Sequence, residues 1–454
     1  MGENVGKKYQ TWNPGLRELE KISENDLIEK LGFSESELFH GYKDKLIEKR
    51  ILFVSDDGFL VFDYVGALII NNNVIFCIPK YICNNDRHLV IGQLFLLFQE
   101  YSKRENLEIE EIETLGEIEN LTEYNMLSVM IFLLNDYYEY GLYSNQKANY
   151  ELNGEDEIIW DYTLNEIQPL IINNKPIFLD FYTSSHFDDE EDYFRTLHKF
   201  ILTECSTRLE LLGLSEYFSY PKINYEIEED IFGQTESILS KIINELPVQF
   251  INRKQRVLKA IYSYISHERI YIGGQSLCFF GTRNFNLVWE KTCAFVLNNQ
   301  IDKFIHLIDK PKWITNSGIV HEGYSIIPDI LSAQKIKNKK YFFIADAKYY
   351  NLLLTDNILS NYPGVEDVNK QYLYQMSFSE FMNSQNYEII QNSFIFPTEG
   401  QFEKIGFVTI DFLKKQNLKD ILLIKLPANI VFDLYIRSKR IDLEKFLNLE
   451  IVAK

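Results

Sequence analysis

The sequence of 454 residues is poor in cysteine, proline and glycine, and each scarcity limits what the chain can be. Its five cysteines form no CxxC pair, which excludes a disulfide framework and a thiolate zinc site. With 11 prolines and 21 glycines, little of the chain can serve as flexible linker. No apolar run reaches the roughly 18 residues that a membrane span needs, and the first residues show no signal-peptide pattern. We therefore expect reduced thiols, a cytoplasmic location and no membrane contact.

The sequence also lacks an excess of positive charge. Its 46 Lys and Arg stand against 66 Asp and Glu, which gives a formal net charge of −20. Such a chain repels the phosphate backbone of DNA, so action on nucleic acid needs a local basic patch, metal ions or a basic partner. The sequence contains no GxxxxGK[ST] phosphate loop either. Nucleotide hydrolysis would therefore have to come from another protein.

Length and hydrophobic pattern predict an α+β protein of three parts, because a single core stops growing above roughly 250–300 residues. Residues 1–115 combine helical periodicity with two β runs around residues 71–73, which predicts an N-terminal α+β domain. Residues 116–269 are mainly helical, with a strand-containing insert, and we interpret them as a connecting region. Residues 270–454 alternate helices with apolar strands and predict an α/β domain with a central mixed sheet.

Two acidic residues and a lysine stand in apolar β segments of the third part. Asp329 follows Pro328 in SIIPDIL, and Asp346 and Lys348 belong to YFFIADAKYY. Side chains alternate between the faces of a strand, so Asp346 and Lys348 share one face. The intervening AQKIKNKK has the length and polarity of a hairpin turn, which would lay the two strands side by side. The hairpin would bring two carboxylates and an amine together.

Carboxylates held this close repel one another and lose hydration unless a cation lies between them. Mg²⁺ suits the site because it keeps several waters and takes only one or two protein carboxylates. The metal polarises a phosphoryl oxygen, and a lysine beside it can position and activate an attacking water. We therefore expect phosphodiester hydrolysis, with Asp329, Asp346 and the Ala347 carbonyl as metal ligands and Lys348 as the catalytic amine.

Other polar residues can support this centre. Glu290 lies at the edge of the apolar stripe of FNLVWEKTCAFV. It is either a third acid, which would ligate the metal through water or orient Lys348, or a salt-bridged helix residue with no role at the site. Gln371 and Tyr374 cluster on a later helix, and a role at the site and a purely structural role both remain open for them. Basic side chains at the hairpin tip and before residue 291 are candidates for contact with DNA phosphates. These candidates are Lys335, Lys337, Lys339, Lys340, Arg253, Arg256 and Arg283.

The order of these motifs resembles the PD-(D/E)XK nuclease superfamily: a helix with an acid, a strand with Asp, a strand with Asp-x-Lys, and a helix with polar groups. Over most of its length the chain also looks like LlaJI-type restriction endonuclease subunits, which are similar to McrC. The resemblance rests on FDYVGALIINNNVIFCIPKYI, on LNGEDEIIWDYTLNEIQP, and on FGTRNFNLVWEK followed by IPDI, DAKYY and DVNKQYLYQ. The second acid is Asp rather than Glu, and both occur in the superfamily.

This resemblance implies the DNA-cleaving subunit of a McrBC- or LlaJI-like restriction system that acts against phage. By motif, Asp329, Asp346 and Lys348 would be catalytic in a Mg²⁺-dependent endodeoxyribonuclease that cuts double-stranded DNA, with Glu290 in support. The resemblance also implies an AAA+ GTPase partner of the McrB type, which would recognise DNA and supply GTP hydrolysis. The N-terminal hairpin that ends at Lys80 either docks this partner or is a plain β core.

Two other functions remain open from the sequence. The chain could be a non-cleaving adaptor that assembles and stimulates the GTPase, although the intact Asp/Asp/Lys set argues against an adaptor. Alternatively, it could be a stand-alone nuclease that acts on structured DNA or RNA, although the net charge of −20 opposes unaided binding. Cleavage assays with and without the partner and Mg²⁺ separate these possibilities.

Overall fold

The chain folds into two compact units in the computed structural model. One unit comprises Met1–Leu121 together with Gln275–Lys454, and the other comprises Thr122–Gly274. The first and third predicted segments thus pack in one unit, and the division at 1–115, 116–269 and 270–454 stays a prediction. The α+β class is confirmed. The structure describes residues 15–31, 36–70, 73–83, 87–104, 126–211, 213–218, 220–270, 277–336, 338–387, 389–416 and 418–441.

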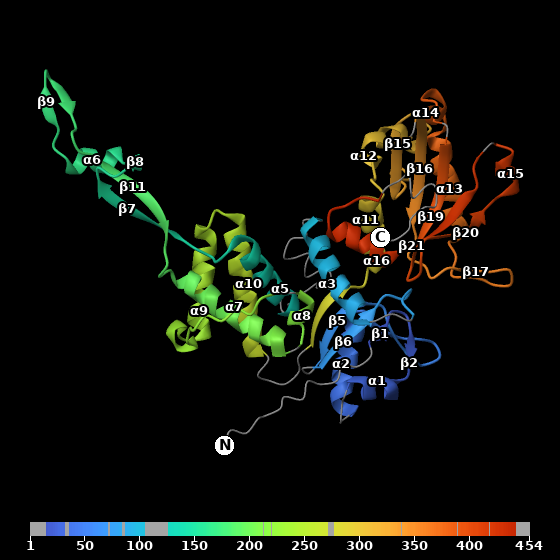
Figure 1. Ribbon diagram of the computed structural model, residues 1–454, viewed down its shortest axis with the longest axis horizontal. Helices are drawn as coiled ribbons and strands as arrows, with labels where there is room; N and C mark the ends of the chain where they lie inside the picture. The colour runs from blue at the N-terminus through green and yellow to red at the C-terminus, as the bar shows by residue number, and fades with distance from the viewer. Residues whose placement is uncertain are drawn as a thin grey trace. The chain divides into compact units, whose positions relative to one another are not determined.

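Two small sheets form the N-terminal part of the first unit (Figure 1). One sheet has the order β1 (Leu16–Arg17), β6 (Asn73–Ile78), β5 (Val65–Ile70) and β12 (Leu277–Thr282). The other has the order β2 (Lys21–Ile22), β4 (Leu60–Phe62) and β3 (Leu52–Val54). Helices α1 (Glu24–Leu31) and α2 (Ser36–Glu48) contribute Leu27, Phe39 and Leu46 to the core shared with these strands. The predicted hairpin is confirmed as β5–β6, and its turn at 71–72 lies outside the described residues.

Strand β12 joins the two halves of this unit, because it pairs with β5 although about 200 residues separate them. The register places Gly66 opposite Gly281. A Cβ atom at Gly66 would lie 2.3 Å from the carbonyl oxygen of Phe280, and Gly66 has a φ of +146°. Only glycine permits this close approach of the two strands.

A mixed sheet forms the C-terminal part of the first unit. Its order is β15 (Ile330–Ile336), β16 (Lys339–Ala347), β19 (Ile389–Thr398), β21 (Ile421–Pro427) and β20 (Glu403–Val408). The three inner strands are parallel to one another and both edge strands are antiparallel to their neighbours. Shorter elements of this part are α12 (Ile301–Phe304), η4 (Ile305–Leu307), β13 (Lys312–Ile314), β14 (Val320–Glu322), β17 (Leu353–Leu354), β18 (Leu359–Ser360) and α15 (Asp411–Lys414).

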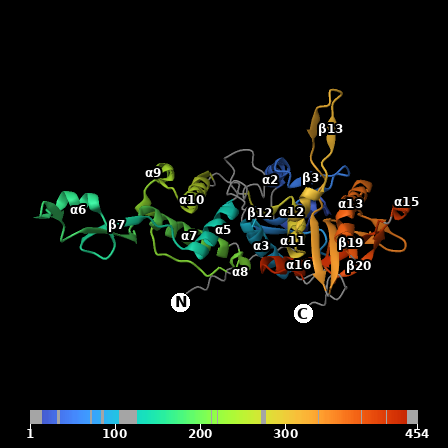
Figure 2. The ribbon, with the colours of Figure 1, turned by 90° about the horizontal axis from the view of Figure 1, so that it is seen from above.

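Helices cover both faces of the mixed sheet (Figure 2). Helices α13 (Val365–Ser377) and α14 (Ser379–Ser384) pack on Phe342 and Ile344 of β16. Helices α11 (Phe285–Val296) and α16 (Ala428–Ile436) cover the other face, where Trp289 Nε1 donates a hydrogen bond to the Ile395 carbonyl at 3.4 Å. Helix α3 (Arg87–Arg104) packs on α16 and ties the N-terminal part to the sheet.

The hairpin predicted between Asp329 and Asp346 is confirmed, but its turn is shorter than AQKIKNKK. Strand β15 runs on to Ile336, and β16 begins at Lys339. Pairing continues because β15 is an edge strand, where exposed charged residues such as Lys335 are tolerated.

The second unit is a group of helices from which a β arm extends (Figure 1). Its helices are α5 (Met126–Tyr140), α7 (Tyr193–Leu211), α8 (Ser215–Phe218), α9 (Thr235–Glu245) and α10 (Asn252–Ile270), with short turns η1 (Glu229–Phe232) and η2 (Leu246–Val248). The arm contains β7 (Gln146–Leu152), β8 (Glu157–Ile158), α6 (Trp160–Glu166), β9 (Leu170–Ile172), β10 (Lys175–Ile177) and β11 (Tyr182–Asp188). The expected strand-containing insert is therefore confirmed. Within the described part of the chain, no helix is long and apolar enough to cross a membrane.

His198 is fully buried within the helices of the second unit. Its Nδ1 accepts a hydrogen bond from the backbone N–H of Tyr143 at 3.0 Å. Burial first, and then the charge of Arg253, lower the pKa of His198 to about 3. The folded protein therefore holds this imidazole neutral at a pH where an unfolded chain would protonate it.

We predict that His198 makes folding sensitive to acid. Its pKa is about 3 when folded and about 6.5 when unfolded, so its stabilising contribution is complete above pH 6.5 and is lost as the pH falls toward 3. The loss approaches about 1.4 kcal/mol per pH unit within that window. His198→Asn keeps an acceptor for Tyr143 without titrating, so its melting temperature should fall less than that of wild type between pH 6.5 and 4.5. Parallel curves for the two proteins would contradict this assignment.

A candidate active site at the end of the central sheet

Asp329 and Asp346 meet where β15 and β16 lie side by side. The register pairs Ile330 with Ala345, so one further step places residue 329 opposite residue 346. The Oδ2 atom of Asp329 accepts a hydrogen bond from the backbone N–H of Ala347 at 2.9 Å. Asp346 is only 7% exposed. The structure thus brings together the two acids that the sequence placed on neighbouring strands, and their catalytic role stays a prediction.

The closeness of Asp346 changes the pKa of Asp329. The pKa of Asp329 is raised to about 8, first by burial, then by the charge of Asp346 and a hydrogen bond with it, and further by Glu290. The hydrogen bond from the Ala347 N–H opposes this rise but does not cancel it. A hard divalent cation between the two carboxylates would offset their repulsion, because it neutralises both at once.

Lys348 is held between two carboxylates. Its Nζ lies 2.6 Å from Asp346 Oδ2 and 2.8 Å from Asp367 Oδ1. Burial by itself lowers the pKa of Lys348, but the charges and hydrogen bonds of Asp346 and Asp367 outweigh burial and raise that pKa above its ordinary value. Lys348 is therefore an ammonium group that donates hydrogen bonds in a fixed direction.

Asp367 is a site residue that the sequence analysis missed. It lies in the first turn of α13, where an acidic side chain ordinarily complements the helix dipole and attracts no further interest. The signal that could have pointed to Asp367 is the packing of α13 against β16. Because of this packing, the first turn of α13 can reach the strand end that carries Lys348.

Glu290 and Tyr374 lie within electrostatic range of the two aspartates. Burial raises the pKa of Glu290, Lys291 opposes the rise, and Asp346 and Lys348 act on it as well. The pKa of Tyr374 is raised by burial and then by Asp346 and Asp329. The Tyr374 hydroxyl donates a hydrogen bond to the Ile327 carbonyl at 3.0 Å, just before Asp329.

Gln371, by contrast, faces the sheet rather than the acids. It is completely buried, and its Nε2 donates a hydrogen bond to the Ser393 carbonyl of β19 at 2.9 Å. Asn392 Nδ2 donates in turn to the Gln371 carbonyl at 3.0 Å. These contacts support the structural interpretation of Gln371.

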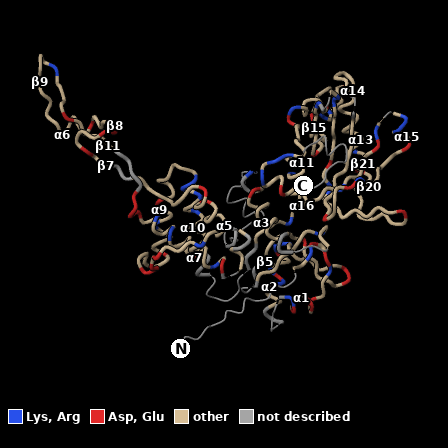
Figure 3. Tube along the Cα trace, in the orientation of Figure 1, with Lys and Arg blue, Asp and Glu red and all other residues tan. Residues whose placement is uncertain are grey.

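The basic candidates for DNA contact differ in how free their side chains are. Lys335 and Lys339 are exposed near the β15–β16 turn, whereas Lys340 donates a hydrogen bond to the Gln385 carbonyl at 2.6 Å. Arg256 is exposed and Arg283 is half-buried, while Lys337 lies outside the described residues. The Arg253 guanidinium is committed to a buried ion pair with Asp136 at 2.8 Å. Basic and acidic residues intermingle along the chain within each unit (Figure 3).

The residues present fit a magnesium ion better than a transition metal. Within the described ranges, no three His, Cys, Asp or Glu side chains form a ready-made metal cluster. Two carboxylates and a backbone carbonyl are nevertheless the hard oxygen donors that Mg²⁺ uses while keeping several waters.

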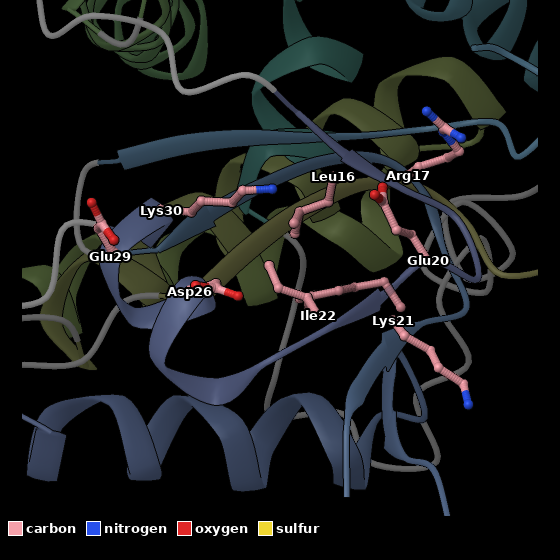
Figure 4. Close-up of a pocket in the computed structure, with 9 residues that line it drawn as sticks. Leu16, Arg17, Glu20, Lys21, Ile22, Asp26, Glu29 and Lys30 are labelled. Atoms are coloured by element: carbon pink, nitrogen blue, oxygen red, sulfur yellow. The ribbon is translucent and has the colours of Figure 1, made fainter. Parts of the chain in front are cut away.

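A cavity of about 470 Å³ lies away from these residues, in the N-terminal part of the first unit (Figure 4). Its lining mixes apolar Leu16 and Ile22 with charged side chains such as Arg17, Glu20 and Lys30. None of the acids around Lys348 lines it. The candidate site is therefore distinct from this cavity.

Known proteins show which class of protein carries this arrangement. The sequence matches the family described as LlaJI restriction endonuclease over residues 64–436, and the chain belongs to that family. The Type II restriction enzyme BsuMI component YdjA of Bacillus subtilis (strain 168) is 30% identical over 423 residues, which cover 89% of this chain and 87% of the relative. The family resemblance expected from the sequence is thus confirmed.

A solved structure also aligns with the chain. It is a Thermococcus gammatolerans assembly of McrB AAA+ hexamers with bound McrC, and the alignment covers 93% of this chain and 98% of the matched chain. The TM-score of 0.38 and the identity of 12% are too low to carry an argument.

We predict that Asp367 is required for full activity. Asp367→Ala should slow DNA cleavage by about tenfold or more, because Lys348 loses one of its two anchors and displacement by about 1 Å can cost about 100-fold. Asp367→Asn keeps an oxygen acceptor and should lose less. Single-turnover cleavage of plasmid DNA measures this, with the exposed neighbour Glu366→Gln as control. Wild-type rates in Asp367→Ala would remove Asp367 from the site.

Proposed function

We propose that this member of the LlaJI family is the DNA-cleaving subunit of a two-component restriction system and hydrolyses phosphodiesters with Mg²⁺. The observation that carries the proposal is the placement of Asp329 opposite Asp346, with the Lys348 ammonium 2.6 Å from Asp346 Oδ2. The β15–β16 hairpin, the parallel strand β19 and the helices on both faces support a PD-(D/E)XK-type core. The −20 charge supports dependence on a metal and a partner.

In this proposal Asp329, Asp346 and the Ala347 carbonyl hold the ion, and Glu290 assists. The bound ion supplies Lewis-acid polarisation of the scissile phosphate and offsets its developing negative charge. The backbone N–H of Ala347 orients the Asp329 carboxylate for this role through its hydrogen bond. Fixed carboxylates matter because the ligands need no reorganisation during the reaction.

Lys348 acts as a donor rather than as a base. Its Nζ carries its proton because both Asp346 and Asp367 stabilise the charged form. It can therefore orient the attacking water and stabilise negative charge on a phosphate oxygen, while its own proton stays in place. The charges of Glu290 and Lys348 interact, and in this proposal Glu290 helps to set the direction of the ammonium group.

We further propose that an AAA+ GTPase binds the N-terminal part and delivers DNA. The sequence has no phosphate loop of its own, which supports a separate source of nucleotide hydrolysis. The β3–β4 hairpin exposes Phe53, Val54 and Phe59 by 42%, 51% and 40%, so it offers an apolar contact surface. Lys80, in contrast, turns inward, with its Nζ 4.3 Å from the centroid of the Tyr349 ring.

We predict that Asp346→Asn abolishes cleavage. The change removes one of the two carboxylate charges that hold Mg²⁺ but keeps the shape of the side chain, so the protein should fold and assemble as before. Plasmid cleavage with and without EDTA measures activity, and co-purification measures assembly. The exposed Asp356→Asn is the matched control and should cut at the wild-type rate. A fully active Asp346→Asn would show that the site assignment is wrong.

We also predict that the purified chain alone binds plain duplex DNA weakly and cuts it little. Its net charge of −20 is unfavourable for phosphate contact, so a dissociation constant of about 1 μM or weaker is expected at physiological salt. Adding the AAA+ protein encoded by a neighbouring gene, with GTP, should restore cleavage. Fluorescence anisotropy and plasmid cleavage measure the two effects. Nanomolar binding by the isolated chain would contradict the division of labour.

A further inference from the structure

Glu18 is a buried acid that the proposed chemistry does not use. It follows β1 in the N-terminal part and is 5% exposed. Burial raises its pKa, while a hydrogen bond from Tyr349 and the charge of Lys80 oppose the rise. A buried carboxyl group is costly unless its partners satisfy it, so the identity of those partners indicates what it does.

One hydrogen-bond partner of Glu18 is Tyr349, which lies just beyond the end of β16. Glu18 Oε2 accepts a hydrogen bond from the Tyr349 hydroxyl at 2.5 Å and one from the Lys80 N–H at 3.2 Å. The Tyr349 ring packs against Tyr81 at 6.2 Å and Phe285 at 5.3 Å between centroids. Tyr349 is therefore enclosed by the N-terminal part and by α11.

Tyr349 directly follows Lys348, and their side chains meet opposite sides of the sheet. Lys348 contacts Asp367 of α13, whereas Tyr349 contacts Phe285 of α11. The Lys348 N–H donates to the Ile395 carbonyl at 2.8 Å, which extends the pairing with β19 by one residue. Because side chains alternate along an extended strand, holding Tyr349 also fixes the direction of Lys348.

A second contact fastens the same N-terminal segment beside β19. The Cys83 N–H donates a hydrogen bond to Glu399 Oε2 at 2.8 Å, one residue after β19 ends. The segment that follows β6 thus contacts the chain just beyond both β16 and β19.

We propose that Glu18 and Tyr349 are positioning residues for the nuclease centre. Their buried hydrogen bond anchors the end of β16 to the N-terminal sheet and holds Lys348 in place between Asp346 and Asp367. The inference rests on the proposed function, because that function gives Lys348 its catalytic position. It adds that the N-terminal sheet is part of the nuclease centre as well as a surface for a partner.

The test uses variants that change the hydrogen bond and little else. Tyr349→Phe removes only the hydroxyl, and Glu18→Ala removes the acceptor. Each should lower the single-turnover cleavage rate by about tenfold or more at saturating DNA, with DNA affinity unchanged. Glu18→Gln keeps the shape of the side chain and one oxygen acceptor. Its cleavage rate should therefore be close to that of wild type. All rates are measured well below the melting temperature of each variant.

Hydrogen exchange provides a readout independent of activity. The amides of residues 346–350 should exchange faster in Tyr349→Phe and in Glu18→Ala than in wild type, and close to wild type in Glu18→Gln. Tyr143→Phe is the matched control, because it removes a buried tyrosine hydroxyl that lies 3.5 Å from Glu245 in the second unit. It should leave cleavage and exchange at residues 346–350 unchanged.

Three results decide the inference. Wild-type rates and exchange in Tyr349→Phe and Glu18→Ala would overturn it. Equal losses of rate in Glu18→Gln and Glu18→Ala, in step with equal losses of melting temperature, would also overturn it in favour of a structural role. Asp346→Asn in the same assay keeps the two proposals apart: if it is inactive while Tyr349→Phe cuts normally, only the positioning role fails.

Discussion

The antiparallel pairing of β15 with β16 is the constraint on which the candidate site depends. The register sets Asp329 opposite Asp346, and the alternation of side chains sets Lys348 on the same face as Asp346. A shift of one residue would turn Asp346 and Lys348 away from α13 and separate them from Asp367. The apolar residues Phe342 and Ile344 fix the register, because they fill the core under α13 and α14. The packing of the strand therefore determines the geometry of its charged end.

Burial gives these charges their chemical character. An exposed aspartate pair would be ionised and separated by water, but here burial and proximity raise the pKa of Asp329 to about 8. Lys348 stays charged despite its burial, because the carboxylates of Asp346 and Asp367 lie within 2.8 Å of its Nζ. Without a cation, the closely spaced carboxylates of this site repel one another. The donor set is composed of hard oxygens, which suit a divalent ion. The arrangement of charges therefore supports the proposed metal dependence.

The sequence predicted the elements of the site better than their mutual contacts. Asp329, Asp346 and Lys348 could be predicted from the sequence, because a two-residue alternation and a short hairpin are local features. Asp367, Glu18 and Tyr349 were not, because each acts through a residue distant in the chain, and Glu18 and Tyr349 are 331 positions apart. Gln371 was a candidate because it clusters with Tyr374 on the helix after the Asp346 strand, yet the packing of α13 turns it toward β19. Periodicity gives the buried face of a helix, but not which strand lies beneath it.

The order of the chain explains why the N-terminal part and the mixed sheet that carries the candidate site cannot be treated as separate modules. Strand β12 completes the N-terminal sheet and leads directly into α11, which carries Glu290 and supports Tyr349. Helix α3 in turn packs on α16, where Arg104 donates a hydrogen bond to the Tyr435 carbonyl at 2.6 Å. Each half therefore supplies packing that the other needs, and residues 122–274 are inserted between them. By the proposed positioning role, a change in the N-terminal sheet that moves Glu18 also moves the end of β16, because Tyr349 links the two through its hydrogen bond.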